Sequence, residues 1–269
     1  MKFLVGQYSS RLRPSRVRGA SLMRRTVVVV PCFNEAKRLD TEAFLLGLRE
    51  QPALEFLFVD DGSSDGTGRV VAEIVARCPE RVHFERLATN SGKAEAVRLG
   101  LQRAFALGPE CVGYLDADLA TPVAELAPMA DAFEDSAVLM VLASRVALLG
   151  RDVRRSAWRH YGGRGFATAA SLILGLKVYD TQCGAKLFRN CDPVRRLFER
   201  PFISSWAFDV EILARLLRLE QAGQVLPVTR SVVEVPVRRW SDVAGSKIGL
   251  GRSILTAAEL PLIWWRYRR

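Results

Sequence analysis

The sequence predicts an α/β protein with a Rossmann-like, mostly parallel sheet that is covered by helices on both faces. Three observations favour this fold class. Short runs of β-branched and other apolar residues recur along the chain, and stretches with helical spacing of apolar residues alternate with them. This alternation is typical of parallel sheets. With 269 residues, of which 49% are hydrophobic, the chain is long enough to bury a sizeable core.

Four apolar runs are predicted to form strands, and a fifth run forms a later strand. They cover residues 26–30, 55–59, 112–115 and 138–143, followed by 232–237. The first run stops at Pro31, and the third is extended by Cys111. Runs without polar alternation are typical of strands that are buried on both faces.

Predicted helices lie between and after these strands. One of them covers residues 93–107, where apolar side chains recur at helical spacing: Ala94, Val97, Leu101, Ala104 and Phe105. The second half of the chain is more helical, with predicted helices at 158–174 and 207–219. The sequence contains no internal repeat, low-complexity linker or clear domain boundary.

The net charge of +10 is concentrated at the two ends of the chain. Residues 1–25 hold seven basic side chains and no acidic one, which leaves +3 for all the rest. We therefore expect 1–25 to be a basic, disordered leader. Because a nucleic-acid binder usually carries its basic residues on a folded face, this distribution disfavours nucleic acid and favours an anionic membrane surface.

The C-terminal residues 251–269 are predicted to form an amphipathic, basic helix. Apolar residues with Trp264 and Trp265 precede Arg266, Arg268 and Arg269, as in helices that lie at a membrane surface. The alternative is an ordinary terminal helix that docks on the protein. The chain has no uncharged apolar run of 18 residues, so we expect no membrane-spanning helix.

The five cysteines form no CxxC pair, which predicts reduced thiols and a cytoplasmic location. Together with the basic ends of the chain, this location predicts peripheral attachment at the inner face of the membrane. The two histidines are far apart in the sequence, which disfavours a histidine-based metal site.

Acidic residues follow three of the predicted strands. Glu35 follows the first, Asp60 and Asp61 end the second, and Asp116 and Asp118 follow the third. Ligands of open parallel sheets bind beyond the carboxyl ends of the strands, so these groups are expected at one edge. Asp116 and Asp118 are two carboxylates one residue apart, and Mg²⁺ or Mn²⁺ prefers such oxygen ligands, often together with substrate phosphates. An alternative for the neighbouring Asp65 is that it caps the next helix.

Two common nucleotide-binding motifs are absent from the sequence. No GxGxxG follows the first strand and no GxxxxGK[ST] occurs, which disfavours a dinucleotide-dependent dehydrogenase and excludes a P-loop protein. A nucleotidyltransferase is disfavoured because a Gly-rich loop after the first strand is missing.

Seven segments of the sequence match motifs of one enzyme family. They are residues 29–35 (VVPCFNE), 59–67 (VDDGSSDGT), 90–93 (NSGK), 116–118 (DAD), 180–188 (DTQCGAKLF), 206–211 (WAFDVE) and 245–247 (GSK). The sequence resembles the family 2 glycosyltransferases, which have the GT-A fold. The last three segments are similar to the dolichyl-phosphate or polyprenyl-phosphate beta-glucosyltransferase branch. The resemblance spans residues 26–250, which would be the GT-A domain.

The resemblance implies a set of residues that bind the nucleotide-sugar donor. In this set, the residues at the ends of the first two strands would contact the base and ribose of the donor. Asp118 would bind the donor through the metal, and Asp116 would be the second metal ligand. The donor-binding residues are Pro31, Glu35, Asp61, Lys93, Asp116, Asp118, Ser246 and Lys247. Related mannosyl enzymes carry Gln where this chain has Ala120, which implies a looser grip on the metal.

The resemblance also implies groups that act on the acceptor. Arg145 would meet an acceptor phosphate, Arg159 is a second candidate for that role, and Asp209 stands where many members keep a catalytic base. An alternative for Asp209 is a carboxylate that stabilises the start of a helix.

The expected activity is inverting, metal-dependent transfer of a sugar, glucose from UDP-glucose, to a polyprenyl phosphate such as dolichyl or undecaprenyl phosphate. Two alternatives stay open. In the first, the acceptor is a soluble or polysaccharide hydroxyl, and Asp209 then becomes essential as the base. In the second, the chain is a non-catalytic module that binds nucleotides or lipid phosphates.

Overall fold

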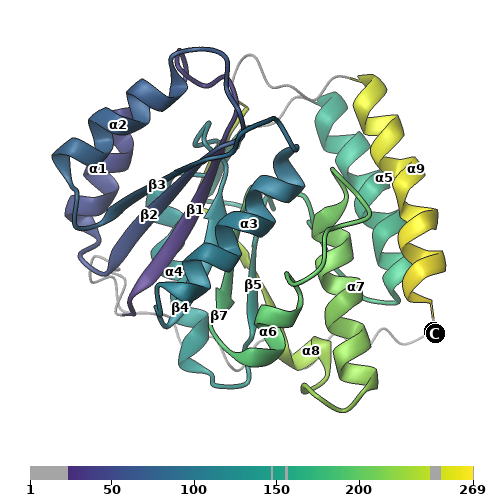
Figure 1. Ribbon diagram of the computed structural model, residues 1–269. Coiled ribbons are helices and arrows are strands. Elements are labelled where there is room, and N and C mark those ends of the chain that lie inside the picture. Colours follow the sequence, from purple (N-terminus) through teal and green to yellow (C-terminus); the bar gives the residue numbers. More distant parts are fainter. Residues whose placement is uncertain (1–23, 147, 155–156, 243–249, 269) are drawn as a thin grey trace.

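A computed structural model describes residues 24–146, 148–154, 157–242 and 250–268 of the chain, without the side chains of 154, 157–161 and 250–258. It confirms the predicted fold class. A twisted sheet runs through the centre of the molecule, with helices packed on both of its faces (Figure 1).

The central sheet has seven strands in the order β3-β2-β1-β4-β7-β5-β8. All of its pairings are parallel except those of β7, which runs antiparallel to both of its neighbours. The strands are β1 Thr26–Cys32, β2 Leu54–Asp60, β3 Val82–Arg86, β4 Cys111–Leu115, β5 Met140–Ser144, β7 Ala185–Arg189 and β8 Val232–Pro236. A separate parallel pair is formed by β6 Asp152–Arg154 and β9 Arg239–Ser241.

Two hydrophobic cores explain why the central strands are continuous apolar runs. Val28 and Val30 of β1 join the core on one face, whereas Val27 and Val29 join the core on the other. Because successive side chains of a strand point to opposite faces, a strand covered on both faces needs apolar residues at every position.

Helices cover the two faces unequally. One core packs under α1 Thr41–Glu50, α2 Thr67–Arg77, α4 Leu126–Ala130 and the short helices η1 Val123–Glu125 and η2 Asp131–Glu134. The other packs under α3 Lys93–Ala106, α5 Ala157–Leu174, α6 Asp192–Arg196, α7 Phe208–Gln221, α8 Val228–Ser231 and α9 Leu250–Tyr267. Helices α5 and α9 stand side by side at one end of the molecule (Figure 1).

Close packing of α3 on the sheet depends on a glycine. A Cβ atom at Gly100 would lie 2.5 Å from Cγ1 of Val29 in β1 and 2.9 Å from Cγ2 of Val59 in β2. Both distances are shorter than any carbon contact tolerates, so only glycine lets this helix approach the strands. Because α3 follows β3, which is parallel to β2, the first residue of the helix lies at the carboxyl edge of the sheet.

Four strands were not predicted from the sequence: β3 and β7 of the central sheet, and the short pair β6 and β9. Strand β3 lies at the edge of the sheet, where Val82 is buried and the other four residues are half-buried or exposed. Among the described residues, no helix is long and apolar enough to cross a membrane. The five cysteines are all free thiols.

Candidate active site

The three acidic segments lie at one edge of the sheet, as predicted. Strands β2, β1 and β4 are neighbours and run parallel, so the residues that follow them emerge side by side. Strand β5 runs antiparallel to β7, which runs antiparallel to β4, so the end of β5 points to the same edge. Arg145, directly after β5, therefore belongs to this group.

The loops after β1 and β2 are joined to each other by hydrogen bonds. The backbone N–H of Asn34 donates to Oγ of Ser63 (2.9 Å), and that of Ser64 donates to the Asn34 side chain (3.0 Å). Asn34 has a φ of 52°, a left-handed conformation that asparagine tolerates better than most residues. The two loops thus form one rigid unit at the edge of the sheet.

Two of the predicted donor-binding residues belong to this unit. Pro31 is a half-buried residue of β1. Glu35 is buried, and its carboxylate pairs with Arg38, whose Nη2 lies 2.6 Å from Oε1. Its backbone N–H donates to Oγ1 of Thr67, 2.7 Å away. Asp65 accepts from the N–H of Thr67, the first residue of α2, but the N-cap position itself is Gly66, so Asp65 is not the capping residue of this helix.

Asp61 is the anchor of the loop that leads into α3. Its carboxylate accepts the backbone N–H groups of Ser91 (2.7 Å) and Gly92 (2.8 Å) and the side-chain amide of Asn90 (3.1 Å). Burial raises the pKa of Asp61, and the two backbone donors act in the opposite direction. The direct consequence of these bonds is a fixed position for Lys93, the next residue.

Lys93 points at the acidic pair that follows β4. Its Nζ lies 2.6 Å from Oδ1 of Asp116. Burial by itself lowers the pKa of Lys93, but the carboxylates of Asp116 and Asp209 outweigh it, so the pKa is raised and the ammonium stays charged. The site therefore holds a fixed positive charge beside the two aspartates.

Asp116 and Asp118 are brought together by a tight turn. The backbone N–H of Asp116 donates to the carbonyl of Gly184 (2.9 Å), and Asp118 accepts the N–H of Ala120 (3.1 Å). Leu119, directly after Asp118, has a φ of 51°, which is rare for a leucine and typical of strained functional turns. Burial and the charge of Asp116 raise the pKa of Asp118, because the two carboxylates repel each other.

This donor set fits a hard divalent cation whose other ligands come from the substrate. Two mutually repelling carboxylates are stabilised by a cation, and Mg²⁺ sites of phosphate-transferring enzymes commonly use one or two carboxylates. The described residues contain no group of three or more His, Cys, Asp or Glu side chains that would hold a metal by themselves. Diphosphate oxygens and water would have to complete the coordination.

Beneath the acidic pair lies a buried group of three side chains. The hydroxyl of Tyr114 in β4 donates to Asp209 in the first turn of α7, and Nζ of Lys186 in β7 lies 3.1 Å from the same carboxylate. Lys186 also donates to the carbonyl of Cys183 (2.8 Å) and is completely buried. Burial raises the pKa of Asp209, while Lys186 opposes that rise.

Arg145 is held by a bidentate ion pair. Its Nε and Nη2 lie 2.6 Å and 2.8 Å from the two carboxylate oxygens of Asp180, and its guanidinium stacks 5.3 Å from the ring centre of Trp240. Although burial opposes the effect, Arg145 lowers the pKa of Asp180 to about 2. Among the described residues, Nη1 of Arg145 has no hydrogen-bond partner, which leaves the N–H groups of this nitrogen for a ligand.

Three predicted site residues cannot be placed at the level of their side chains. Arg159 lies in the first half of α5, where side chains are outside the description, and Ser246 and Lys247 lie outside the described residues. Their roles stay predictions, as do the ligand contacts of the other predicted residues.

Sequence reasoning missed Tyr114, Lys186 and Asp180 as parts of the site. The signal for Lys186 was present: a lysine between Ala185 and Leu187 in an apolar run indicates a buried charge that needs a partner. The partner itself, Asp209, lies on a helix that is distant in the sequence.

Comparison with known families assigns the chain. Residues 27–192, more than half of the chain, match the family described as Glycosyl transferase family 2. The chain belongs to this family. The glycosyltransferase is 31% identical over 255 residues to "Dolichyl-phosphate beta-glucosyltransferase" from Dictyostelium discoideum, covering 89% of this chain and 74% of that relative. It is 27% identical over 233 residues to "Polyprenol monophosphomannose synthase" from Mycolicibacterium smegmatis, covering 84% and 83%.

Solved structures place the glycosyltransferase in the GT-A fold. The mannosyltransferase PcManGT from Pyrobaculum calidifontis, in complex with GDP-Man and Mn²⁺, superimposes with a TM-score of 0.61 at 19% identity, covering 90% of this chain and 63% of that one. Glucosyl-3-phosphoglycerate synthase from Mycobacterium tuberculosis, in complex with UDP, gives 0.59 at 18% identity, covering 91% and 80%. The predicted family, branch and fold are thereby confirmed.

Proposed function

We propose that this glycosyltransferase transfers glucose from UDP-glucose to a polyprenyl phosphate, with inversion at the anomeric carbon. The observation that carries the proposal is the convergence of Lys93, Asp116 and Asp118 at the carboxyl edge of the sheet. The chain that presents them is 31% identical to a relative named for glucosyl transfer to dolichyl phosphate. In the reaction, an acceptor phosphate oxygen forms a bond to the anomeric carbon as the bond to the diphosphate breaks and UDP leaves.

The donor would lie across the ends of β1, β2 and β4. Asp116 and Asp118 would hold Mg²⁺ or Mn²⁺, which when bound neutralises charge on the leaving diphosphate. The ammonium of Lys93 would add a second positive charge at the same place. The resemblance extends this site to Pro31, Glu35, Asp61, Ser246 and Lys247.

The acceptor phosphate would be bound by Arg145. Its ion pair with Asp180 fixes the guanidinium in one orientation and leaves Nη1 to donate to a phosphate oxygen. A phosphomonoester has a second pKa of about 6, so it is already ionised at neutral pH and needs little help from a base. Arg159 would be a second phosphate ligand.

The position of Asp209 supports a phosphate acceptor over a hydroxyl acceptor. A hydroxyl must lose a proton to a base, and Asp209 is the residue that the resemblance offers for this task. Its Oδ1 already accepts the hydroxyl of Tyr114 and lies 3.1 Å from Nζ of Lys186, so these two donors compete with an acceptor hydroxyl for this oxygen.

The test measures both halves of the reaction. The protein is incubated with UDP-[¹⁴C]glucose, Mn²⁺ or Mg²⁺ and a short polyprenyl phosphate in detergent, and lipid-extractable label is measured beside UDP release. We expect labelled lipid with the unchanged chain and a loss of at least about a hundredfold for Asp118→Asn and Arg145→Gln. Asp192→Asn, at an exposed position in α6, is the matched control and should be unchanged.

The other outcomes separate the alternatives. UDP release that requires a soluble or polysaccharide acceptor, with no lipid product, would replace the lipid acceptor by a hydroxyl one. Labelled lipid from another nucleotide-sugar but not from UDP-glucose would change the donor and keep the acceptor.

A further inference from the structure

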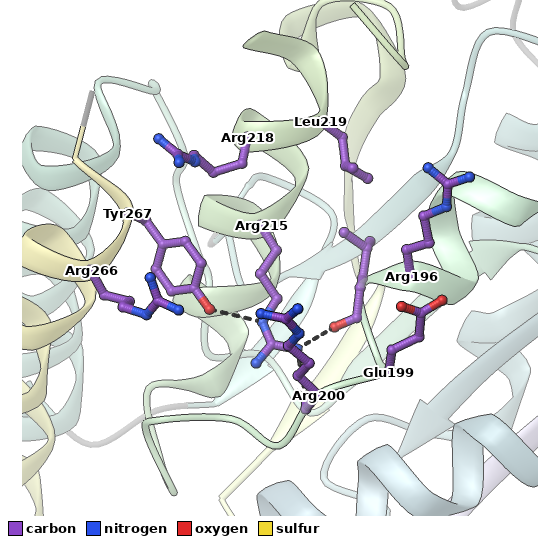
Figure 2. A pocket seen from close by; sticks show the side chains of 9 residues that line it. Arg196, Glu199, Arg200, Arg215, Arg218, Leu219, Arg266 and Tyr267 are labelled. Carbon is purple, nitrogen blue, oxygen red and sulfur yellow. Dashed lines mark hydrogen bonds between the residues drawn. The ribbon is translucent and has the colours of Figure 1, made fainter. Parts of the chain in front are cut away.

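A basic pocket lies far from the candidate active site. It has a volume of about 180 Å³ and is formed by the second half of α7, the residues after α6 and the end of α9 (Figure 2). Its lining residues are Arg196, Leu197, Glu199, Arg200, Arg215, Arg218, Leu219, Arg266 and Tyr267. Asp209 and Leu219 are ten residues apart on one helix, so the pocket and the active site are separated by about 15 Å along α7.

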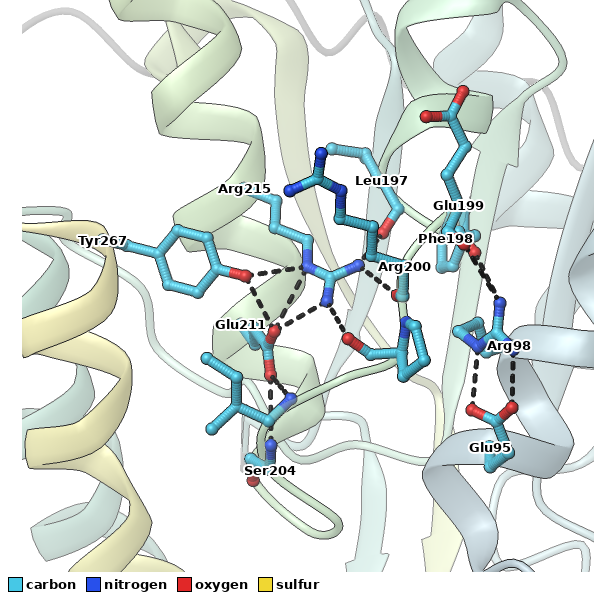
Figure 3. Close-up of polar contacts among 12 residues, drawn as sticks. Glu95, Arg98, Leu197, Phe198, Glu199, Arg200, Ser204, Glu211, Arg215 and Tyr267 are labelled. Atoms are coloured by element: carbon cyan, nitrogen blue, oxygen red, sulfur yellow. Dashed lines mark hydrogen bonds and ion pairs between the residues drawn. The ribbon is translucent and has the colours of Figure 1, made fainter.

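The floor of the pocket is a rigid loop. Arg215, buried in α7, donates to the carbonyls of Leu197 (2.6 Å), Arg200 (2.8 Å) and Pro201 (2.6 Å). Arg98 from α3 donates to the two carbonyls between them, of residues 198 and 199 (Figure 3). Five consecutive carbonyl groups are thus held by two arginines, which fixes the backbone that carries the exposed side chains of Arg196 and Arg200.

The end of α9 is attached to the same network. The hydroxyl of Tyr267 donates to Glu211 (2.9 Å) and accepts from Nε of Arg215 (3.1 Å; Figure 3). Glu211 also bonds Arg215 itself, at 2.8 Å from Nη2. All N–H groups of Arg215 are therefore engaged within the protein, and its role in the pocket is structural.

The rim of the pocket carries positive charge that the described residues do not neutralise. Arg200, Arg218 and Arg266 are exposed, and none has an acidic partner within the described part of the chain. Arg196 donates to the amide oxygen of Gln224 (2.9 Å). Among the lining residues Glu199 is the one acidic side chain, so a net positive charge faces the opening. Guanidinium groups that are carried by a rigid backbone are suited to bind two oxygens of one phosphate group.

Large apolar side chains are exposed on the last turns of α9, close in sequence to the pocket residues Arg266 and Tyr267. Leu262 is 55% exposed, Trp264 47% and Trp265 66%, although the opposite side of the helix is buried through Leu260 and Ile263. The guanidinium of Arg268 lies 5.6 Å from the ring centre of Trp264. Tryptophan with arginine at one end of a helix is typical of protein surfaces at the depth of lipid headgroups.

We propose that this pocket and the adjoining end of α9 form a docking site for an anionic lipid membrane, with a lipid phosphate in the pocket and the two tryptophans among the headgroups. A symmetric dimer through this face would place the arginines of both copies against each other, which is unfavourable. The α9 helix is thus both docked on the protein and exposed on its outer face. The proposal does not depend on the identity of donor or acceptor.

The test is sedimentation of the full chain with vesicles of phosphatidylcholine, with and without phosphatidylglycerol. We expect binding only to the acidic vesicles, weakened by high salt, and a blue shift of tryptophan fluorescence that is lost in Trp264→Phe/Trp265→Phe. The double variant Arg200→Gln/Arg218→Gln should bind about fivefold more weakly for each arginine removed. The matched control Arg69→Gln/Arg103→Gln removes the same charge from exposed positions on α2 and α3.

Three results would overturn the proposal. Equal loss of binding in the two double variants would mean that net charge acts without the pocket. Binding to a single-stranded oligonucleotide but not to acidic vesicles would assign the surface to nucleic acid. A concentration-dependent dimer whose formation buries Trp265 would assign it to a second copy. Transfer to a detergent-solubilised acceptor is measured in parallel, so that loss of docking is distinguished from loss of the proposed activity.

Discussion

At the scale of single residues, Gly184 sets the position of the acidic pair. A Cβ atom at this position would lie 2.3 Å from Oδ2 of Asp116, a distance that forces the carboxylate to move. We predict that Gly184→Ala lowers kcat/KM for sugar transfer by about tenfold to a hundredfold, because a displacement of about 1 Å at a reacting group has effects of this size. Steady-state kinetics with saturating divalent metal measures the change.

The matched control for this substitution is Gly165→Ala in α5. A Cβ atom there meets no atom within 4 Å, so the variant should keep full activity. Alanine inside a helix should also stabilise the protein by about 0.5–1 kcal/mol. If both variants lose activity alike, the contact between Gly184 and Asp116 is not the cause.

The buried pair of Lys186 and Asp209 gives a second prediction. Lys186→Met leaves an unpaired carboxylate in a buried place, and we expect it to lower the free energy of unfolding by about 3–5 kcal/mol. Adding Asp209→Asn removes the unpaired charge and should restore part of the loss. Urea unfolding of the two single variants and the double variant measures the coupling, and additive losses would contradict it.

Activity of Asp209→Asn separates two roles of this residue. If the acceptor is a phosphate, turnover should stay within about tenfold of the unchanged chain, since no obligatory base is lost. A loss of several orders of magnitude, in a variant that still folds, would assign Asp209 to proton abstraction.

The ion pair of Asp180 and Arg145 makes stability depend on pH. Because the pKa of Asp180 is lowered to about 2, the ionised carboxylate stabilises the folded state above its unfolded pKa of about 3.9. This contribution, about 2 kcal/mol, should be lost as the pH falls from about 4 to about 2. Asp180→Asn should therefore be less stable than the unchanged chain at neutral pH, with a gap that narrows below about pH 4. Asp192→Asn, at an exposed site, should show no such gap at any pH.

At the scale of elements, Arg215 connects α7 with the loop after α6 and with α9. Its guanidinium holds three backbone carbonyls and Glu211, all of which would lose a donor in Arg215→Met. We predict a loss of about 3–5 kcal/mol in the free energy of unfolding. Arg218→Met, one turn further on the same helix and exposed, should stay within about 0.5 kcal/mol. Equal effects in chemical denaturation would contradict the assignment.

Five of the seven strands of the central sheet could be predicted from the sequence, and the two exceptions have a physical reason. Strands β1, β2 and β4 are apolar throughout because both of their faces are covered, so their runs are easily recognised. Strand β7 carries Lys186 and Arg189 and pairs antiparallel between β4 and β5. A charged lysine is not expected in a central strand, and Lys186 is tolerated there because Asp209 from α7 neutralises it. Strand β3, at the edge, alternates too briefly to be distinguished from a loop.

At the scale of the whole molecule, ligand binding should be visible as stabilisation. UDP and Mn²⁺ together, at about a hundred times their Kd, should raise the free energy of unfolding by about 2.7 kcal/mol, because they bind the folded state alone. Thermal unfolding should show a rise with both ligands that exceeds the sum of the separate rises, and the excess should disappear in Asp118→Asn. An undiminished excess in that variant would place the metal elsewhere.

The sequence by itself determined the fold class, the family and the edge of the sheet at which the site lies. These features depend on local information: apolar periodicity within each strand, and acidic residues that directly follow the strand ends. Their position after the third predicted strand placed Asp116 and Asp118 at this edge, and the resemblance to the family added Lys93 and Arg145 to the site.

Only the tertiary structure decided which charges meet. Lys93 faces Asp116, Lys186 faces Asp209 and Arg145 faces Asp180, and in each pair the partners lie on different elements that are distant along the chain. The basic pocket likewise joins α6, α7 and α9. Electrostatic interactions fall off with distance in space, not with separation along the sequence, so such pairs become defined only when packing places the elements against each other.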